Sequence, residues 1–312
     1  MGLTSLLDLE LAVPAPDELQ AFWEGHGMRV TGPGMLGSLD RPSLLRLREG
    51  AYRHVAEMRV ACETESDLDA IGRRLERLGL APVRGDGVLR CPDPILDHTV
   101  VVQIGAAAAL TPPGPRSLNR PGRPERLNRR STACLGQAPH APRRLGHVVF
   151  GTPDVAASRA FYVEGLGFKV SDSIGDMAYF LRCSPDHHNV LLMPSAVPCL
   201  NHYALEMDDI DAIGLAGAKV LAQRPDCSIT GIGRHVVGAN LFWYMLDPTG
   251  GMFELYADMD QIVDDEKWAA EHFRDDWDPF KISSWNSSAV RADFFAPADI
   301  DAIAKARAAA GR

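Results

Sequence analysis

Residues 145–170 read "LGHVVFGTPDVAASRAFYVEGLGFKV", and residues 7–30 read "LDLELAVPAPDELQAFWEGHGMRV". Each stretch holds a short apolar run, a Pro-Asp pair, two adjacent aromatic residues and a Gly-x-Gly exit. The apolar run predicts a strand, and the Pro-Asp pair predicts the start of a helix, with Asp17 or Asp154 as its N-cap. Both stretches therefore predict a strand, a helix and a second strand, in that order.

Three further pairs of similar segments follow in the same order along the chain. They are "HVAEMRV" (54–60) with "HYALEMDD" (202–209), "LDAIG" (68–72) with "IDAIG" (210–214), and "LDHTVVVQIG" (96–105) with "LDPTGGMFELY" (246–256). Ordered matches of this kind indicate an internal duplication. Short strands alternating with few long helices predict an α+β fold of tandem βαβββ modules, in two similar domains whose curved mixed sheets each enclose a cavity.

The segment between the two halves has a different composition. Residues 105–144 hold an Ala run, a Pro- and Gly-rich stretch, and eight arginines against one glutamate. We predict a basic linker or surface excursion there, and we prefer a solvated connector to an anion-binding arm. The rest of the chain divides into an N-terminal module pair, 1–104, and a C-terminal catalytic domain with a tail, 145–312.

Composition narrows the class of function. The chain has 312 residues and a net charge of −9, which argues against a nucleic-acid partner because such proteins need a basic surface. No apolar run approaches the length of about 20 residues that spans a membrane. Six scattered cysteines without a Cys-x-x-Cys pair, and no apolar segment after Met1, indicate a reduced, cytoplasmic protein.

Three residues of the C-terminal half suggest a metal site. His147 and His202 lie in the first predicted strands of two successive modules, and Glu254 lies in a later, apolar strand. Taken singly, such a histidine is more often a core residue, and such a glutamate more often faces solvent. Pseudo-symmetry would bring the two first strands together across a cavity, and two imidazoles with one carboxylate suit non-haem Fe(II). A divalent ion would also offset the charge of Glu254, which is costly to bury unpaired.

The N-terminal half provides a comparison. The places that match the three residues fall near Leu9, near Arg53 or His54, and near Gln103. None of these sets repeats the pattern of two imidazoles and a carboxylate. We therefore expect one metal ion, in the second half, and a degenerate, metal-free first half that serves as a scaffold.

The run "GRHVVGANLFWYMLDPTGGMFE" (233–254) carries the most specific motif. Its two apolar runs flank an Asp-Pro-Thr-Gly turn, which predicts a β-hairpin. The order Gly-x-His, aromatic-Tyr, Asp-Pro-x-Gly and Glu resembles the signature of the type I extradiol ring-cleavage dioxygenases of the vicinal oxygen chelate superfamily, which include 2,3-dihydroxybiphenyl and catechol 2,3-dioxygenases. The resemblance extends from about Leu145 to Trp268 and, more faintly, over the N-terminal half.

The resemblance implies a reaction and a cofactor. The reaction would be extradiol cleavage of a catechol-type aromatic diol with O2, in which a superoxide-like oxygen attacks the metal-chelated catecholate and gives a muconic semialdehyde type product. The metal would be Fe(II), with Mn(II) as the alternative, and its ligands would be His147, His202 and Glu254. The rival interpretations are a glyoxalase-type metal-dependent isomerase or lyase, and a non-catalytic small-molecule binding protein on the same fold.

The resemblance also implies residues that act on the substrate. His188 would be the acid/base histidine, and its neighbour His187 competes for that role, because alternation along a strand would turn the two side chains to opposite faces. His235 and Tyr244 would hydrogen-bond the oxygens of the substrate. The expected partners are the diol, O2 and further copies of the chain in a homo-oligomer. We expect a cover over the cavity mouth, or a subunit contact, from the segment that holds Trp268, Trp277 and Trp285.

Overall fold

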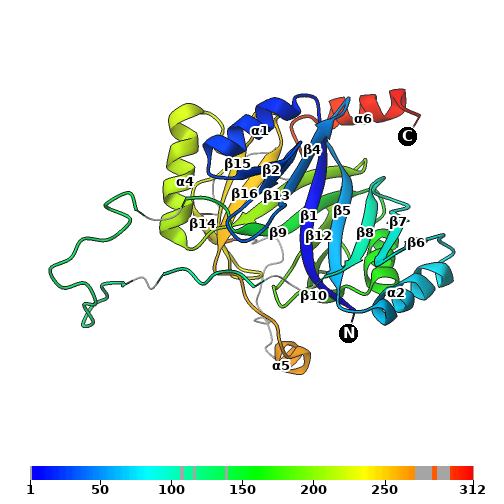
Figure 1. The fold of residues 1–312 in the computed structure, drawn as a ribbon, viewed down its shortest axis with the longest axis horizontal. Helices are drawn as coiled ribbons and strands as arrows, with labels where there is room; N and C mark the ends of the chain where they lie inside the picture. The colour runs from blue at the N-terminus through cyan, green and yellow to red at the C-terminus, as the bar shows by residue number, and fades with distance from the viewer. Residues whose placement is uncertain are drawn as a thin grey trace.

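The computed structural model describes residues 2–105, 109–114, 117–137, 140–270, 283–286 and 296–311. Within those ranges the chain forms two mixed sheets with helices around them (Figure 1). The first sheet consists of β1 (Leu3–Val13), β2 (Arg29–Gly32), β3 (Met35–Gly37), β4 (Leu45–Glu49), β5 (His54–Cys62), β6 (Val83–Gly85), β7 (Val88–Pro92) and β8 (Thr99–Ile104). The second consists of β9 (Arg144–Thr152), β10 (Lys169–Ile174), β11 (Ala178–Arg182), β12 (Val190–Pro194), β13 (Cys199–Glu206), β14 (Gly233–His235), β15 (Leu241–Leu246), β16 (Met252–Ala257) and β17 (Ser283–Trp285).

The helices are fewer and mostly short. They are α1 (Pro16–Gly25), α2 (Glu65–Arg77), α3 (Val155–Ala160), the π-helix η1 (Phe161–Leu166), α4 (Ile210–Gln223), α5 (Asp265–Ala270) and α6 (Ile300–Ala309). The described part of the chain contains no helix that is long and apolar enough to cross a membrane.

The two sheets repeat one arrangement. Their strand orders are β2-β3-β4-β1-β5-β8-β7-β6 and β10-β11-β12-β9-β13-β16-β15-β14-β17, which match position by position except for the added β17. The pairs β1–β4 and β9–β12 are both parallel, and the pairs β1–β5 and β9–β13 are both antiparallel. Each half is thus a strand, a helix and three strands, twice over. This confirms the α+β class and the tandem βαβββ modules.

The predicted helix starts are correct at one position and wrong at the other. Asp154 caps α3, because its side chain accepts a hydrogen bond from the backbone N–H of Ala157 at 2.8 Å. Asp17 lies inside the first turn of α1 and caps nothing. That helix begins at Pro16, the residue before Asp17, and the fixed φ of proline suits the first helical position.

One apolar core runs through both halves. Its buried members come from both sheets, for example Leu9 on β1 and Val148 on β9. Trp23 on α1 reaches into the C-terminal half, where its indole N–H donates a hydrogen bond to the Tyr203 hydroxyl at 3.1 Å. Its ring meets Phe253 edge-on at 4.9 Å. Strands β13 and β16 of the second sheet are therefore supported by a helix of the first half.

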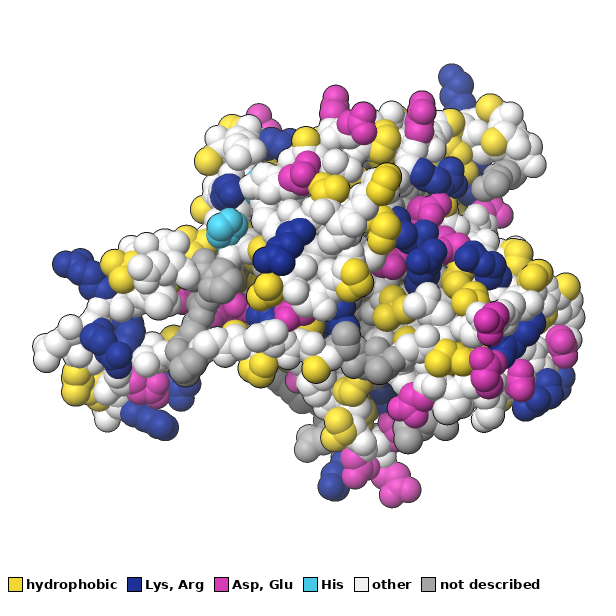
Figure 2. Space-filling model, in the orientation of Figure 1, with side chains coloured by type: hydrophobic (Ala, Val, Ile, Leu, Met, Phe, Trp, Pro, Cys, Tyr) yellow, Lys and Arg dark blue, Asp and Glu magenta, His cyan; other side chains and the backbone are white. Residues whose placement is uncertain are grey.

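The described parts of residues 105–144 extend away from the body of the molecule (Figure 1). Figure 2 shows that the charged side chains on this extension are mostly basic, all of these being arginines, and it shows acidic and basic side chains interspersed over the rest of the visible face. The end of the segment is fastened to the body. Arg143 binds Asp40 at 2.7 Å and Asp208 at 2.6 Å, and Arg144, the first residue of β9, binds Asp186 at 2.6 Å. A solvated connector over the whole of 105–144 stays a prediction.

Candidate metal centre

Strand register brings three distant residues to one face of the second sheet. Strands β9, β13 and β16 are neighbours, and Ala204 on β13 pairs with His147 on one side and with Glu254 on the other. Paired residues point to the same face, and so does His202, two residues before Ala204. The small side chain of Ala204 leaves room above it for the two longer side chains to meet.

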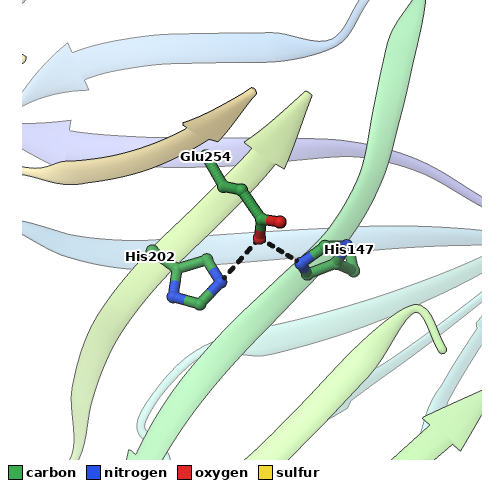
Figure 3. Close-up of side chains that lie close together, drawn as sticks. All are labelled: His147, His202 and Glu254. Carbon is green, nitrogen blue, oxygen red and sulfur yellow. Dashed lines mark hydrogen bonds and ion pairs between the residues drawn. The ribbon is translucent and has the colours of Figure 1, made fainter. Parts of the chain in front are cut away.

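The three side chains converge as Figure 3 shows. The Nε2 atom of His147 lies 2.8 Å from Oε2 of Glu254, and Nε2 of His202 lies 3.3 Å from the same oxygen. One candidate ligand atom from each residue lies within 4.8 Å of the other two. All three residues are buried, and Glu254 is 0% exposed. The sequence-based expectation that two imidazoles and a carboxylate meet in the C-terminal half agrees with this geometry.

The electrostatics of the site keep the carboxylate charged. Burial alone would raise the pKa of Glu254, but the adjacent imidazoles of His147 and His202 outweigh burial and hold this pKa well below its usual range. Burial lowers the pKa of His202, with the charge of Glu254 opposing that effect. A neutral imidazole has a lone pair on one ring nitrogen. His202 and Glu254 therefore place one nitrogen ligand atom beside one anionic oxygen ligand atom.

The donor set fits a divalent first-row metal ion. Such an ion lies about 2.0–2.2 Å from imidazole nitrogen and carboxylate oxygen, so two ligands at right angles are about 3 Å apart. The separations of 2.8 and 3.3 Å are of that size. Among the described residues, the buried Nε2 of His202 makes no hydrogen bond of good geometry, and its nearest polar neighbour of those given above is Oε2 of Glu254 at 3.3 Å. A buried nitrogen in that state is costly unless something binds it.

Asn240, which the sequence analysis did not single out, orients the carboxylate. Its side-chain N–H donates a hydrogen bond to Oε1 of Glu254 at 2.9 Å, which leaves Oε2 to face the two histidines. Ala239 before it has a φ of 53°, so a tight turn places this amide at the start of β15. An asparagine next to a turn is common in sequences, and nothing in its spacing distinguished this one.

Gly146, next to His147, is required by close packing. A Cβ atom at this position would lie 1.8 Å from the hydroxyl of Tyr256, so no other residue fits without a rearrangement. The carbonyl of Gly146 accepts a hydrogen bond at 3.0 Å from Asn189, which is fully buried. The backbone that carries His147 is thus held from both sides.

His235 and Tyr244 lie side by side next to the three candidate ligands. Nε2 of His235 is 2.9 Å from the Tyr244 hydroxyl and 4.0 Å from Oε1 of Glu254. Phe242 stacks on the imidazole of His235 at 4.1 Å, and its ring occupies the space where a Cβ of Gly233 would lie, which explains the glycine of the Gly-x-His motif. Burial, together with the charge of Glu254, raises the pKa of Tyr244 well above 10, so the phenol stays protonated.

His188 and His187 are both buried, but they face different groups. The ring of His188 lies 4.4 Å from the ring of His147, whereas Nε2 of His187 lies 2.8 Å from Oδ2 of Asp172. Neither residue belongs to a strand, because β12 begins at Val190, so strand alternation does not apply to this pair. Burial, and then the positive charge of the neighbouring histidines, lowers the pKa of His188 well below its usual value.

Of the three tryptophans singled out, one adjoins this region. Trp268 on α5 donates a hydrogen bond to the carbonyl of Ser171 at 3.0 Å, and its ring lies 5.5 Å from that of His187. Trp285 lies on β17, and Trp277 lies outside the described residues.

Strand register identifies the equivalent positions in the first sheet. The parallel pairs begin with Leu9 beside Leu45 in the first sheet and with Val148 beside Val190 in the second, and all four belong to the shared core. Asp8 precedes Leu9 and His147 precedes Val148, so both face the opposite side of their sheets from the core residues. The equivalents of the three candidate ligands are Asp8, Glu57 and Val101.

These equivalents differ from the places expected from sequence, which were Leu9, Arg53 or His54, and Gln103. The pairing of β1 with β5 contains register shifts. Residues that match by sequence similarity therefore do not occupy equivalent positions in the two sheets. Asp8 and Glu57 both bind the guanidinium of Arg46, at 2.8 and 2.7 Å. In the first half a side-chain cation neutralises the carboxylates at the corresponding place.

The sequence of this chain is similar to a known protein family and to individual members of it. A model of the Glyoxalase/Bleomycin resistance protein/Dioxygenase superfamily matches residues 144–255. Metapyrocatechase 2 from Cupriavidus necator is 32% identical over 277 residues, which cover 84% of this chain and 83% of the relative. An iron-dependent extradiol dioxygenase from Rhodococcus jostii (strain RHA1) is 35% identical over 141 residues, which cover 40% of this chain and 46% of the relative.

A solved structure extends the similarity to the whole fold. The Mn(II)-bound glyoxalase from Novosphingobium aromaticivorans superposes with a TM-score of 0.70 at 21% identity, covering 96% of this chain and 99% of that chain. At this level of identity the likeness concerns the fold and not the reaction.

Proposed function

Since the chain belongs to the extradiol dioxygenases of the glyoxalase, bleomycin resistance protein and dioxygenase superfamily, we propose that it opens the ring of a catechol-type aromatic diol with O2. The bond broken would be the one beside the two hydroxyl-bearing carbons, giving a muconic semialdehyde type product. Family membership confirms the resemblance that the hairpin motif at 233–254 indicated.

One observation carries the proposal for this chain's own residues. His147, His202 and Glu254 come from three neighbouring strands and place their ligand atoms within 4.8 Å of one another in a buried site. We assign them as the ligands of a divalent metal ion. Such an ion, when bound, lowers the pKa of a chelated hydroxyl group and mediates electron transfer from the diol to O2.

His235 and Tyr244 suit the recognition of substrate oxygens. Tyr244 is protonated at neutral pH because burial raises its pKa, so its hydroxyl can donate a hydrogen bond to a deprotonated oxygen of the diol. His235 lies 2.9 Å from that hydroxyl and orients it. His235 lies near Oε1 of Glu254, which is the oxygen that Asn240 binds.

His188 suits proton transfer. It is an uncharged histidine in a buried position against the ring of His147, so its ring can take a proton from the substrate and return one later in the reaction. We propose His188 rather than His187 for this role, because the ring of His187 is turned to Asp172.

The identity of the metal is part of the proposal. We propose Fe(II), which the name of the Rhodococcus jostii relative supports. The donor set of two imidazoles and one carboxylate accepts Mn(II) as well. Metal analysis of protein purified from iron-supplemented cells, with activity of apoprotein reloaded separately with each ion, distinguishes the two.

We also propose that the chain works as a homo-oligomer in the cytoplasm. Light scattering of the purified protein tests the first statement, and a single molecular mass equal to that of one chain would contradict it.

Ring cleavage is tested by loading the protein anaerobically with Fe(II) and adding a panel of catechols and then air. The expected result is uptake of O2 with formation of a coloured ring-opened product. Glu254→Gln, which keeps the size of the side chain but removes the charge, should lose both metal and activity, while Asp176→Asn on the β10–β11 turn should keep both.

A metal-replete protein that consumes no O2 with any catechol of the panel would overturn the proposal. Isomerisation of an adduct between a thiol and an α-keto aldehyde under the same conditions would instead favour the glyoxalase-type alternative.

A further inference from the structure

A line of three side chains runs from the candidate metal centre towards solvent. Nδ1 of His188 lies 3.0 Å from Nδ1 of His187, and Nε2 of His187 lies 2.8 Å from Oδ2 of Asp172. His187 is fully buried, and His188 is 4% exposed. The side chain of Asp172, on β10, is 26% exposed. The inner end of the line is the residue assigned above to proton transfer.

The middle member of this line is held firmly in place. The edge of the His187 ring meets the rings of Phe180 and Trp268 at 5.7 and 5.5 Å. Its backbone N–H donates a hydrogen bond to the carbonyl of Asp260 at 2.9 Å. A Cβ atom on Gly238 would lie 3.1 Å from Nδ1 of His187, so the absence of that side chain lets the imidazole fit. The position of His187 Nδ1 is therefore set by packing.

The hydrogen bonds in this line determine which ring nitrogens carry protons. An ionised carboxylate accepts hydrogen bonds and donates none, so the proton between Asp172 and His187 belongs to Nε2 of His187. The Nδ1 atom of a neutral His187 then has a lone pair. Because two Nδ1 atoms 3.0 Å apart share one proton, that proton is on His188. A neutral His188 with a proton on Nδ1 has an unprotonated Nε2.

We propose that Asp172 and His187 are positioning residues that hold His188 in the tautomer with a free lone pair on Nε2. Only this tautomer can accept a proton at Nε2, and Nδ1 is already bound to His187. The catalytic use of this tautomer rests on the proposed function. The tautomer itself follows from the hydrogen bonds alone. The Asp-His pair acts as an orienting group behind the acid/base residue, in the way that such groups act behind catalytic histidines elsewhere.

The tautomer itself can be observed without any reaction. The protein is loaded with Zn²⁺ as a diamagnetic ion, without catechol or O2, and its histidine side chains are studied by ¹⁵N NMR. We expect a proton on Nδ1 of His188 and on Nε2 of His187. A proton on Nε2 of a neutral His188 in the parent protein would overturn the proposal, whatever the outcome of the ring-cleavage assay.

Variants connect the tautomer to turnover. His187→Leu removes the acceptor, and we expect kcat to fall about 10- to 100-fold, the range seen when a supporting hydrogen-bond partner is removed. KM and metal content should change little. His187→Asn places its side-chain oxygen near the former Nδ1 position and should restore part of the loss. Asp172→Asn should mix the two tautomers in the NMR spectrum and lower kcat about 10-fold.

Asp176→Asn is the matched control, because Asp176 lies in the turn that follows β10 and accepts a hydrogen bond from the Tyr179 hydroxyl at 3.1 Å. It should leave the spectrum and kcat unchanged. If His187→Leu folds, binds metal and keeps the parent kcat, or if Asn restores nothing compared with Leu, the positioning role is wrong. If the parent protein shows the expected tautomer but cleaves no catechol, the proposed function fails and the tautomer assignment stands.

Discussion

Asn240 determines which oxygen of Glu254 faces the two imidazoles, and this makes its removal informative. Asn240→Ala frees Oε1 and lets the carboxylate rotate, so we expect the affinity for Fe(II) or Zn²⁺ to fall about 10- to 100-fold. Competition titration against a chelator measures this. Asn119→Ala, in the 105–144 segment, is the control. An unchanged affinity for Asn240→Ala would show that packing alone orients Glu254.

Ala204 lies between His147 and Glu254 in the sheet, and its size matters for the same reason. Ala204→Leu would fill the space in which the two side chains meet, so we expect loss of bound metal together with about 1–3 kcal/mol of stability. Ala204→Ser differs by one atom and should keep the metal. Metal analysis and urea unfolding measure the two effects. A leucine variant that binds metal normally would contradict this account of the site.

At the scale of residues, some of the site could be predicted from the sequence and some could not. His147, His202 and Glu254 were accessible because duplication makes two of them equivalent and the hairpin motif contains the third. Asn240 and Asp172 were not accessible, because each acts through a contact with a side chain that is distant along the chain or across a turn. Single polar residues of these types occur in most loops, so the sequence has no signal for them.

At the scale of elements, two apolar runs that flank turn residues predicted the hairpin of β15 and β16 correctly. The expected alignment of the two halves was wrong by up to a few residues. The reason is that β1 pairs with β5 through several register shifts, and a shift of one residue moves a side chain to the other face of the sheet. Short sequence matches do not reveal where a bulge lies.

Strand β9 needs a glycine at position 146 because the side chain of Tyr256, from β16, packs against it. Gly146→Ala would place a methyl group 1.8 Å from the Tyr256 hydroxyl, so we expect a loss of about 1–3 kcal/mol of stability and weaker metal binding through the displaced His147. Calorimetry and metal titration check both parts. Gly214→Ala, in the interior of α4, would place its methyl group in ordinary van der Waals contact with Ile232 at 4.0 Å, so it should be neutral or stabilising by up to about 1 kcal/mol.

At the scale of the whole molecule, the two halves are joined through buried polar groups as well as through the apolar core. His98, just before β8, stacks on Phe150 of β9 at 4.9 Å, and its Nε2 lies 3.1 Å from the hydroxyl of Tyr162 in η1. Burial lowers the pKa of His98 to about 3. Charging the imidazole at this junction would therefore cost stability.

The sign of the pH dependence follows from that shift. The unfolded imidazole titrates near 6.5, so the stability contributed by neutral His98 is present above pH about 6.5 and is lost as the pH falls towards about 3. The full loss is on the order of 5 kcal/mol. His98→Phe should flatten the acid limb of stability against pH, measured by urea unfolding. An equally steep limb in the variant would show that other groups govern acid unfolding.

Asp93 acts in the opposite direction in the same region. Burial raises its pKa to about 6, so the stability contributed by its neutral form is present below pH about 4 and is lost as the pH rises through about 6. The two effects partly cancel between these limits. Asp93→Asn should therefore steepen the acid limb that His98→Phe flattens, and the two single variants separate the contributions.

The sequence by itself determined the class of fold, the duplication, the family and the chemical types of the candidate ligands, because periodicity, repeats and motifs are local or ordered along the chain. The tertiary structure determined which side chains are in contact. Register placed Ala204 between His147 and Glu254, packing turned His187 towards Asp172, and the first half supplied Trp23 behind the strands of the site. These contacts join residues far apart in the chain, and their energies depend on burial and distance, which exist only once the sheets have formed.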